Sequence, residues 1–355
     1  MKVALVYDRV NKWGGAERVL LAFHKIFPDA DLFTSVYNEK TASWANKFCI
    51  KTSFLQNFPF AKSSHELYAS LMPIAFEGFN FDSYDLVISI TSEAAKGIIT
   101  NPNTLHICYC LTPTRYLWSG YNDYFRNPFL RFFSKPAVSY LRYWDKIAAK
   151  RPNKYIAIST EVKTRIKNYY QEDSEIIFPP FMFPQNDTSG KTKGDFFLLV
   201  SRLVYYKRSD LAIEAFNKLG LPLKIVGTGS QMSYLKSIAK PNIEFLGDLT
   251  DEKLSFYYKN CKALIFPGLE DFGLTMVEAQ SFGKPVIAFR GGGAMDIVKD
   301  GITGEFFSEQ SLESLIKSME IFSNKSYNSK LCRENALRFS FDKFKEQIQK
   351  AVSRN

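Results

Sequence analysis

The sequence has no long apolar run and no recognisable leader. No stretch approaches the roughly 18 apolar residues that would predict a membrane-spanning helix. The apolar run within the opening MKVALVYDRV is too short for the core of a signal peptide, and no small-residue cleavage site follows it. These absences predict a cytoplasmic location, with peripheral contact at the inner face of the cell membrane left open.

Paired cysteines are also lacking. The five cysteines are scattered and odd in number, none forms a CxxC pair, and two of them lie in one apolar, strand-like run. Buried free thiols are therefore favoured over a disulfide or a zinc site at these positions: Cys49, Cys108, Cys110, Cys261 and Cys332.

Acidic residues are too few to balance the basic ones. The 355 residues include 46 Lys and Arg against 36 Asp and Glu, which gives a formal net charge of +10. This excess favours a polyanionic partner, which could be nucleic acid, anionic lipid or a phosphorylated substrate. Charge alone does not choose among the three.

Short apolar runs alternate with helical patterns in two series, and the chain is long enough for two domains. The runs are continuous, as in parallel strands that are buried on both faces. The first series has strands at 3–8, 84–90, 105–111 and 154–160, with helical patterns at 15–27, 92–99 and 161–170. A second series begins with 196–202 and 208–219, after a Pro-, Gly-, Ser- and Lys-rich seam at 178–195.

This order predicts an α/β protein with two Rossmann-like domains facing a central cleft. We assign 1–187 to an N-terminal acceptor-binding domain and 188–338 to a C-terminal nucleotide-sugar-binding domain. A helix within 339–355 is expected to pack back towards the N-terminal domain. Ligands in such sheets bind beyond the carboxyl ends of strands.

Glycines follow several of the predicted strands. They would let backbone amides at a helix start approach a phosphate, but tight turns explain each of them about equally well. The pairs and the triplet concerned are Gly14 and Gly15, Gly227 and Gly229, and Gly291–Gly293.

Two cations and two glutamates also follow predicted strands. Arg202 and Lys207 could hold a diphosphate and neutralise it as it departs, although isolated cations are more often solvated. In PGLEDFGLTMVEAQ, Glu270 lies in a loop and Glu278 within or near a helix. Either carboxylate could accept hydrogen bonds from a diol, or could be a helix-dipole or surface charge. A hydrolase pair is disfavoured because both lie on one loop–helix segment.

Together these segments resemble glycosyltransferase family 4, the retaining GT-B enzymes. The resemblance is carried by GGAERV, SRLVYYKR, VGTGS, FPGLEDFGLTMVEAQSFGKPVIA and GGGAMDIVKDGITGEFF. The glutamates look like the family's E-x7-E motif. SFLQNFPFAK, LMPIAFEGF, AAKGIIT, LHICYCLTPTRYLW and IIFPP extend the resemblance along the chain, towards the bacterial O-antigen mannosyltransferase branch.

The resemblance implies a metal-independent, retaining hexosyltransferase with no cofactor. Its catalytic residues would be Arg202, Lys207 and Glu270. The donor would be bound by Gly14, Gly15, Gly227, Gly229, Phe272, Gly273, Leu274, Thr275 and Glu278. The implied reaction moves mannose from GDP-mannose to a polyprenyl-diphosphate-linked glycan in surface polysaccharide synthesis.

Three positions depart from the family pattern, namely Leu111 (often His in relatives), Met276 (usually Pro) and Asp296 (usually Glu). The loss of a possible hydrogen-bond donor at Leu111 leaves two alternatives open. One is a UDP-sugar-dependent transferase of the same family, and the other is a non-catalytic protein that binds sugar nucleotides or glycans. A metal-dependent GT-A enzyme, suggested by DAD at 29–31, is disfavoured because the triplet follows a helix.

The segment 115–154 interleaves basic and aromatic residues, with only Asp123 and Asp145 acidic. It could dock on an anionic membrane, or it could be a packing or dimer surface. Nucleic acid is disfavoured because no binding motif accompanies the patch. Residues near the strand ends of the N-terminal domain are assigned to the acceptor side: Lys96, Thr112, Arg115 and Trp118.

Overall fold

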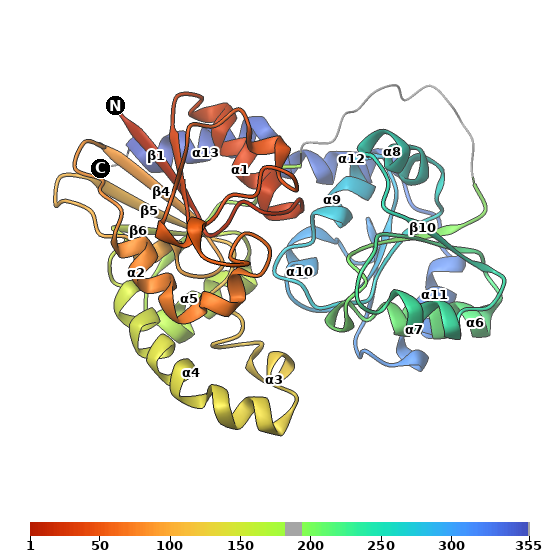
Figure 1. The fold of residues 1–355 in the computed structure, drawn as a ribbon. Helices are drawn as coiled ribbons and strands as arrows, with labels where there is room; N and C mark the ends of the chain where they lie inside the picture. The colour runs from red at the N-terminus through yellow and green to blue at the C-terminus, as the bar shows by residue number, and fades with distance from the viewer. Residues whose placement is uncertain (182–193, 354–355) are drawn as a thin grey trace. The chain divides into compact units, whose positions relative to one another are not determined.

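The computed structural model describes residues 1–181 and 194–353. They form two compact units, Met1–Phe178 (unit 1) and Pro179–Asn355 (unit 2) (Figure 1). The predicted boundary at 187/188 lies outside the described residues, and the predicted packing of 339–355 towards the N-terminal domain stays a prediction. Across the described ranges, no helix combines the length and the apolar character needed to span a bilayer.

Unit 1 is built on a seven-stranded, all-parallel sheet in the order β3-β2-β1-β4-β5-β6-β7. The strands β1 and β4 are buried along their whole length, because helices cover both faces of such a sheet. The strands are β1 Val3–Tyr7, β2 Asp31–Thr34, β3 Ile50–Thr52, β4 Leu86–Thr91, β5 Leu105–Cys110, β6 Lys154–Ala157 and β7 Ser174–Ile176.

The helices of unit 1 include one long element that follows the aromatic-basic pattern. They are α1 Gly15–Ile26, α2 Met72–Glu77, α3 Tyr121–Tyr124, α4 Pro128–Ala148 and α5 Thr160–Tyr170, with short 3₁₀ helices η1 Ser43–Ala45, η2 Phe54–Asn57, η3 His65–Leu71 and η4 Ala95–Gly97. One core joins Val6, Phe33 and Val87 on the sheet to Phe76 of α2 and Trp144 of α4.

Unit 2 repeats the design with a six-stranded parallel sheet in the order β10-β9-β8-β11-β12-β13. Its strands are β8 Phe197–Val200, β9 Leu223–Val226, β10 Ile243–Gly247, β11 Leu264–Phe266, β12 Val286–Phe289 and β13 Gly304–Phe307. Its helices are α6 Ser209–Leu219, α7 Met232–Ile238, α8 Asp251–Asn260, α9 Leu274–Ser281, α10 Ala294–Ile297, α11 Leu312–Ser323, α12 Ser329–Ala336 and α13 Phe341–Ser353, with η5 Tyr205–Lys207 and η6 Leu337–Phe339.

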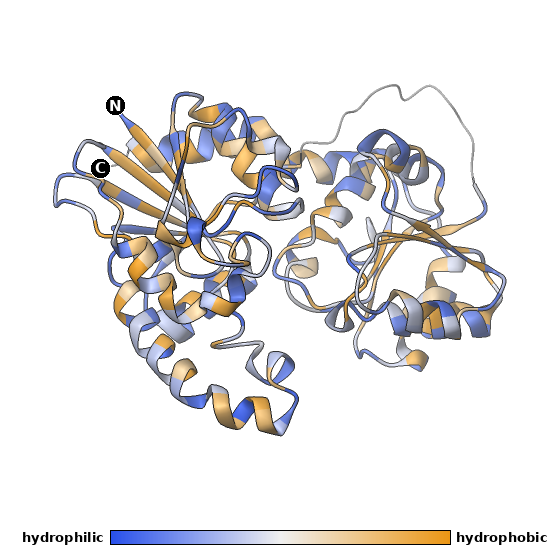
Figure 2. Ribbon diagram, viewed as in Figure 1, coloured by the Kyte–Doolittle hydropathy of each residue, from blue (hydrophilic) through white to orange (hydrophobic). Residues whose placement is uncertain are grey.

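The helices of unit 2 form two layers, as the doubly wound prediction requires. Helix α6 packs against α7 and α11, while α9 packs against α8, α10 and α12. Figure 1 shows these two groups on opposite faces of the sheet, and Figure 2 shows apolar residues concentrated along the strands between them. The continuous apolar runs therefore predicted the layer order correctly.

The helix expected at 92–99 is wrong. The segment forms the single 3₁₀ turn η4, and the backbone amides of Ser92, Glu93, Ala94 and Ala95 all point at the carboxylate of Asp8. Because a helix would place those amides along its axis, this side-chain acceptor favours a loop that wraps around one buried charge.

Candidate functional site

The carboxyl end of β8 in unit 2 is a point where the winding of the sheet reverses. The next strand along the chain, β9, lies on one side of β8, and β11 lies on the other. The loop after β8 (201–208) and the loop after β11 (267–273) therefore leave the same edge side by side, where doubly wound proteins bind ligands. We call these two loops the switch loops of unit 2.

The switch loops bring the two predicted cations and Glu270 together. Lys207 forms an ion pair with Glu270, and their side chains are 11% and 21% exposed. Arg202 donates a hydrogen bond of 2.8 Å to the Tyr206 hydroxyl, and the Lys207 ammonium lies 5.3 Å from the centre of the Tyr206 ring. Tyr206 thus contacts both cations at the edge of the sheet.

Glu278 lies in α9 and is buried, with 5% of its surface exposed. Its Oε2 accepts a hydrogen bond of 2.8 Å from the Tyr258 hydroxyl of α8, which fixes the direction of the carboxylate. Helix α9 begins after Gly273, whose φ of 100° suits glycine, and no side chain caps it. The first-turn amides, which include those of Leu274 and Thr275, are the kind that bind anions.

Close packing explains several of the glycines for which the sequence allowed either a phosphate contact or a tight turn. A methyl group at Gly227 would lie 2.0 Å from the backbone carbonyl oxygen of Ser201, and one at Gly229 would lie 2.3 Å from that of Leu203. In the same way, a methyl group at Gly292 would lie 2.2 Å from the backbone carbonyl oxygen of Glu270. These glycines let neighbouring loops touch backbone to backbone, and contact with a donor stays a prediction for Gly227 and Gly229.

The Phe272 ring is buried in the protein, where it packs against Phe339 with ring centres 5.6 Å apart. If Phe272 binds the donor as predicted, it would do so through its backbone groups.

Unit 1 has a corresponding switch point between β1 and β4, and Asp8 occupies it. The Asp8 carboxylate follows β1 and accepts hydrogen bonds from the Thr91 hydroxyl and from the amides of the loop after β4. Burial raises the pKa of Asp8, and the nearby Glu93 carboxylate raises it further, while the amides oppose this. The carboxylate fixes the loop that carries Glu93.

A polar cluster lies beside Asp8. Arg9 forms an ion pair with Glu93 at 2.5 Å, and the His65 Nε2 lies 3.9 Å from the other Glu93 oxygen. Burial lowers the pKa of His65 to about 4, and the positive charge of Arg9 acts in the same direction. His65 is therefore neutral near pH 7 and can contribute hydrogen bonding but no charge.

Gly14 and Gly15 stand at the start of α1, where Gly14 is the N-cap residue without a side-chain hydrogen bond. Glu17 in the first turn is buried and accepts a hydrogen bond of 2.7 Å from the Tyr7 hydroxyl. Glu17 is thus held inside unit 1 by Tyr7. A role of the two glycines at the donor stays a prediction.

Two of the predicted acceptor-side residues converge on one buried carboxylate, Asp145 of α4. Lys96 forms an ion pair with it, the Trp118 indole donates to it at 2.7 Å, and the Thr114 hydroxyl donates at 3.3 Å. Burial alone would lower the pKa of Lys96, but the Asp145 charge reverses this and raises it. Both charged side chains are almost fully buried, so the structure gives Lys96 a packing role inside unit 1.

The other acceptor-side residues lie near the end of β5. The Thr112 hydroxyl accepts from Arg165 at 3.2 Å and is buried, while Arg115 is half-buried. Leu111, the departure from the family pattern, is 8% exposed and adds no hydrogen-bonding side chain at this strand end. Contact between these residues and an acceptor stays a prediction.

Sequence reasoning missed Asp8, Asp145, Tyr206 and Tyr258. A signal existed for two of them. Asp8 closes an apolar strand, and Asp145 falls in helical register with Val138, Leu141 and Ala148, on the buried face of α4. Tyr206 lies beside the predicted cations in the sequence, but its contact with both depends on how the loop folds. Tyr258 carried no sequence signal, because its partner Glu278 lies 20 residues further along the chain.

Comparisons with known proteins place unit 2 among glycosyltransferase sequences. Residues 184–339, less than half of the chain, match the family model "Glycosyl transferases group 1". The chain is 30% identical over 212 residues to "O-antigen chain mannosyltransferase C" of Escherichia coli, and the alignment covers 55% of each protein. The chain spans about half the length of the curated relatives it matches. Similarity to glycosyltransferases is confirmed at this level, and family 4 stays a prediction.

Solved structures confirm the predicted GT-B fold class. HepE of Anabaena, described as a complex with UDP and glucose, has a TM-score of 0.71 at 20% identity and covers 100% of both chains. Sucrose-phosphate synthase from Thermosynechococcus elongatus has a TM-score of 0.75 at 15% identity, covering 99% of this chain and 98% of its own. Identities this low show the fold alone.

Replacing Asp145 with asparagine should destabilise unit 1 by about 3–5 kcal/mol, because the Lys96 ammonium would stay buried without its counter-charge. Urea unfolding followed by tryptophan fluorescence reads this unit alone, since all four tryptophans lie in it: Trp13, Trp44, Trp118 and Trp144. Removing both charges in Lys96→Met/Asp145→Leu should recover most of the loss. A single variant within about 1 kcal/mol of the parent would show that the pair is not important for stability.

Proposed function

We propose that the protein is a metal-independent, retaining glycosyltransferase of family 4. It would transfer a hexose, with mannose from GDP-mannose favoured, to a lipid-linked oligosaccharide in bacterial surface polysaccharide synthesis. The observation that carries the proposal is the grouping of Arg202, Lys207 and Glu270 on the switch loops, next to the N-terminus of α9. Sequence similarity to a protein named as an O-antigen mannosyltransferase supports the choice of mannose.

The grouping suits the departure of a nucleoside diphosphate. Lys207, Arg202 and the first-turn amides of α9 would stabilise the negative charge that develops as the bond from the sugar C1 to the phosphate oxygen breaks. The acceptor hydroxyl would attack C1 from the same face and pass its proton to the leaving phosphate. This route needs no enzymatic nucleophile, so the configuration at C1 is retained without a covalent intermediate.

The two glutamates would hold the donor on either side of the diphosphate. Glu270 would accept hydrogen bonds from sugar hydroxyls while Lys207 orients it. Glu278, held by Tyr258, would accept from the ribose hydroxyls. A UDP-sugar donor is the alternative to a GDP-sugar, and the structural neighbour described with UDP and glucose supports testing both.

The decisive experiment is turnover by the full chain with panels of GDP- and UDP-sugars, with and without a polyprenyl-diphosphate-linked acceptor. Transfer that survives EDTA, with the product anomer matching the donor, is the expected result. Tight binding of a sugar nucleotide without hydrolysis or transfer would favour the non-catalytic alternative instead.

Lys207→Ala should lower kcat by about 100-fold or more, because the lost charge acts on the leaving group in the transition state. Its melting temperature should fall as well, because the mostly buried pair joins the two switch loops, so kcat is compared at a temperature where both proteins are folded. Lys262→Ala is the matched control, because this lysine pairs with Asp195 at the surface of the same unit. A kcat within a few-fold of the parent would count against the assigned role.

Glu278→Gln should raise the donor KM by about tenfold or more with a smaller effect on kcat, because hydrogen bonds to a charged group contribute about 1.5–3 kcal/mol. Tyr258→Phe is the matched variant that keeps the carboxylate and removes only its partner, and its KM should rise less. An unchanged donor KM in Glu278→Gln would reject the ribose assignment.

Helix α4 supports the proposed approach to a lipid-linked acceptor. Its first ten residues, 128–137, include no buried residue. Apolar residues continue along one exposed stripe at helical spacing: Phe129 (76% exposed), Phe132 (65%), Phe133 (76%), Tyr140 (46%), Tyr143 (70%) and Ile147 (45%). Core contacts come instead from another face, with Val138, Leu141 and Trp144. Figure 2 shows apolar and polar residues interleaved along this helix.

Cations lie along one side of the exposed stripe, and they favour an anionic partner. By helical spacing, Arg131, Lys135, Arg142 and Lys146 form a row beside the Phe132 and Tyr143 edge. Arg131, Arg142 and Lys146 also contact residues 117–125 of the same unit through hydrogen bonds or ring contacts. An aromatic stripe beside a cationic row suits the interface of an anionic bilayer, where rings enter the headgroup region and cations meet lipid phosphates. We therefore propose that α4 lies on the anionic membrane surface that carries the acceptor.

Phe132→Ser/Phe133→Ser should weaken binding to phosphatidylglycerol-containing vesicles by about tenfold or more, because two exposed rings no longer leave water. Leu67→Ser, at an apolar side chain of unit 1 that is 70% exposed, is the control. Vesicle co-sedimentation at low and high salt measures the effect, and salt should weaken the parent. Equal binding to pure phosphatidylcholine vesicles, or self-association through this face, would contradict the proposal.

A further inference from the structure

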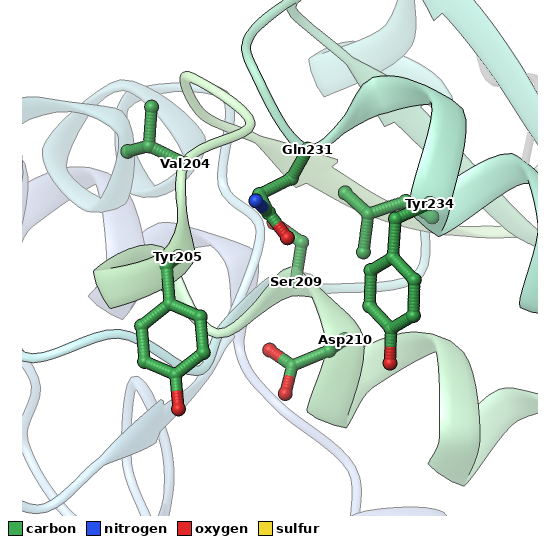
Figure 3. A pocket seen from close by; sticks show the side chains of 7 residues that line it. Val204, Tyr205, Ser209, Asp210, Gln231 and Tyr234 are labelled. Carbon is green, nitrogen blue, oxygen red and sulfur yellow. The ribbon is translucent and has the colours of Figure 1, made fainter. Parts of the chain in front are cut away.

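Unit 2 has a pocket beside the switch loops that the proposed reaction does not use. It measures about 250 Å³ and lies between the loop after β8, the first turn of α6 and the start of α7 (Figure 3). Val204 and Tyr205 come from the loop, Ser209 and Asp210 from α6, and Gln231 and Tyr234 from the α7 region. None of the four charged residues assigned to the donor lines it.

The pocket contains a buried polar group without a partner. Ser209 is 3% exposed, it lines the pocket, and its hydroxyl has no hydrogen-bond partner among residues 1–181 and 194–353. Leaving a buried hydroxyl unpaired is unfavourable, and native proteins rarely do so without a ligand or a functional reason. Helix α6 also begins without a side-chain cap, since Arg208 before it has a left-handed φ of 54°. Both features favour a ligand with hydrogen-bonding oxygens.

The charge balance of the lining disfavours a phosphate. The Asp210 carboxylate lines the pocket and would repel an anion, although α6 begins there. Arg208 approaches both Asp210 oxygens at 3.3 Å, which balances the charge of the carboxylate inside the protein. The pocket therefore suits a neutral ligand that presents both apolar surface and hydroxyl groups.

The shape and chemistry of the lining match one sugar ring. Figure 3 shows Tyr205 and Tyr234 on opposite sides, with Asp210 and Gln231 between them. Both tyrosines are about half exposed, at 53% and 50%, so they form the rim. Their rings can pack on the apolar face of a pyranose, while the carboxylate and the amide exchange hydrogen bonds with its hydroxyls.

We propose that this pocket is a second carbohydrate subsite, which binds one neutral pyranose residue of a glycan. The subsite does not depend on the transfer reaction, because its residues are separate from the donor-binding ones. The subsite shares the loop 201–208 with the proposed donor site, since Tyr205 lies between Arg202 and Lys207 in the sequence. A bound sugar would therefore contact the loop that holds both cations.

The test is saturation-transfer NMR on the full chain with methyl α-D-mannopyranoside, methyl α-D-glucopyranoside and methyl β-D-galactopyranoside, followed by a titration of the best binder. We expect saturable binding that persists with excess GDP and UDP. Tyr234→Ala and Gln231→Ala should each weaken it at least tenfold. Phe256→Ala, at a ring 61% exposed on α8 of the same unit, should bind as the parent does.

Each other outcome overturns the subsite. Absence of saturable binding for all three glycosides would do so, and so would binding that the pocket variants leave unchanged. If GDP or UDP displaces the glycoside and Tyr234→Ala weakens the nucleotide instead, the pocket belongs to the donor. Turnover by the same variants is measured in parallel, so failure of the subsite is distinguished from failure of the proposed transferase.

Discussion

Within each unit, the position of the loops around the site depends on the point where the winding of the parallel sheet reverses. In unit 2 the strands on either side of that point are β8 and β11, and the Lys207–Glu270 ion pair joins the two loops that leave them. In unit 1 the strands are β1 and β4, and Asp8 joins the corresponding loops through its hydrogen bonds to 91–95. In each unit a carboxylate near the end of a strand therefore determines where the neighbouring loops lie.

Much of this could be predicted from the sequence. Strands buried on both faces have a continuous apolar pattern, so β1, β4, β5, β6, β8, β9, β10, β11 and β12 were identified, and the two-layer order followed. The placement of Arg202, Lys207 and Glu270 at one edge also followed, because parallel strands share a carboxyl end. The fold class is confirmed by structures that cover nearly the whole chain.

What could not be predicted depends on partners that are distant in the sequence. The segment 92–99 has a helical pattern, yet the Asp8 carboxylate, more than 80 residues earlier, holds its amides in a loop. Lys96 carries a charge that suggested an exposed role, but Asp145 of α4 makes it a buried residue. The strands β2, β3, β7 and β13 were also missed, because charged residues interrupt their apolar pattern: Asp31, Lys51, Glu175 and Glu305.

The contact of Gly229 with Leu203 has a consequence for how this protein can change over evolutionary time. Any side chain at Gly229 would collide with the backbone of Leu203, so substitutions at this position should be selected against. The frame that carries the cations is thus closed to substitution, whereas Tyr205 and Tyr234 on its rim are half exposed and can vary at small cost. New preferences for a ligand would therefore arise by exchange of rim residues on an unchanged frame.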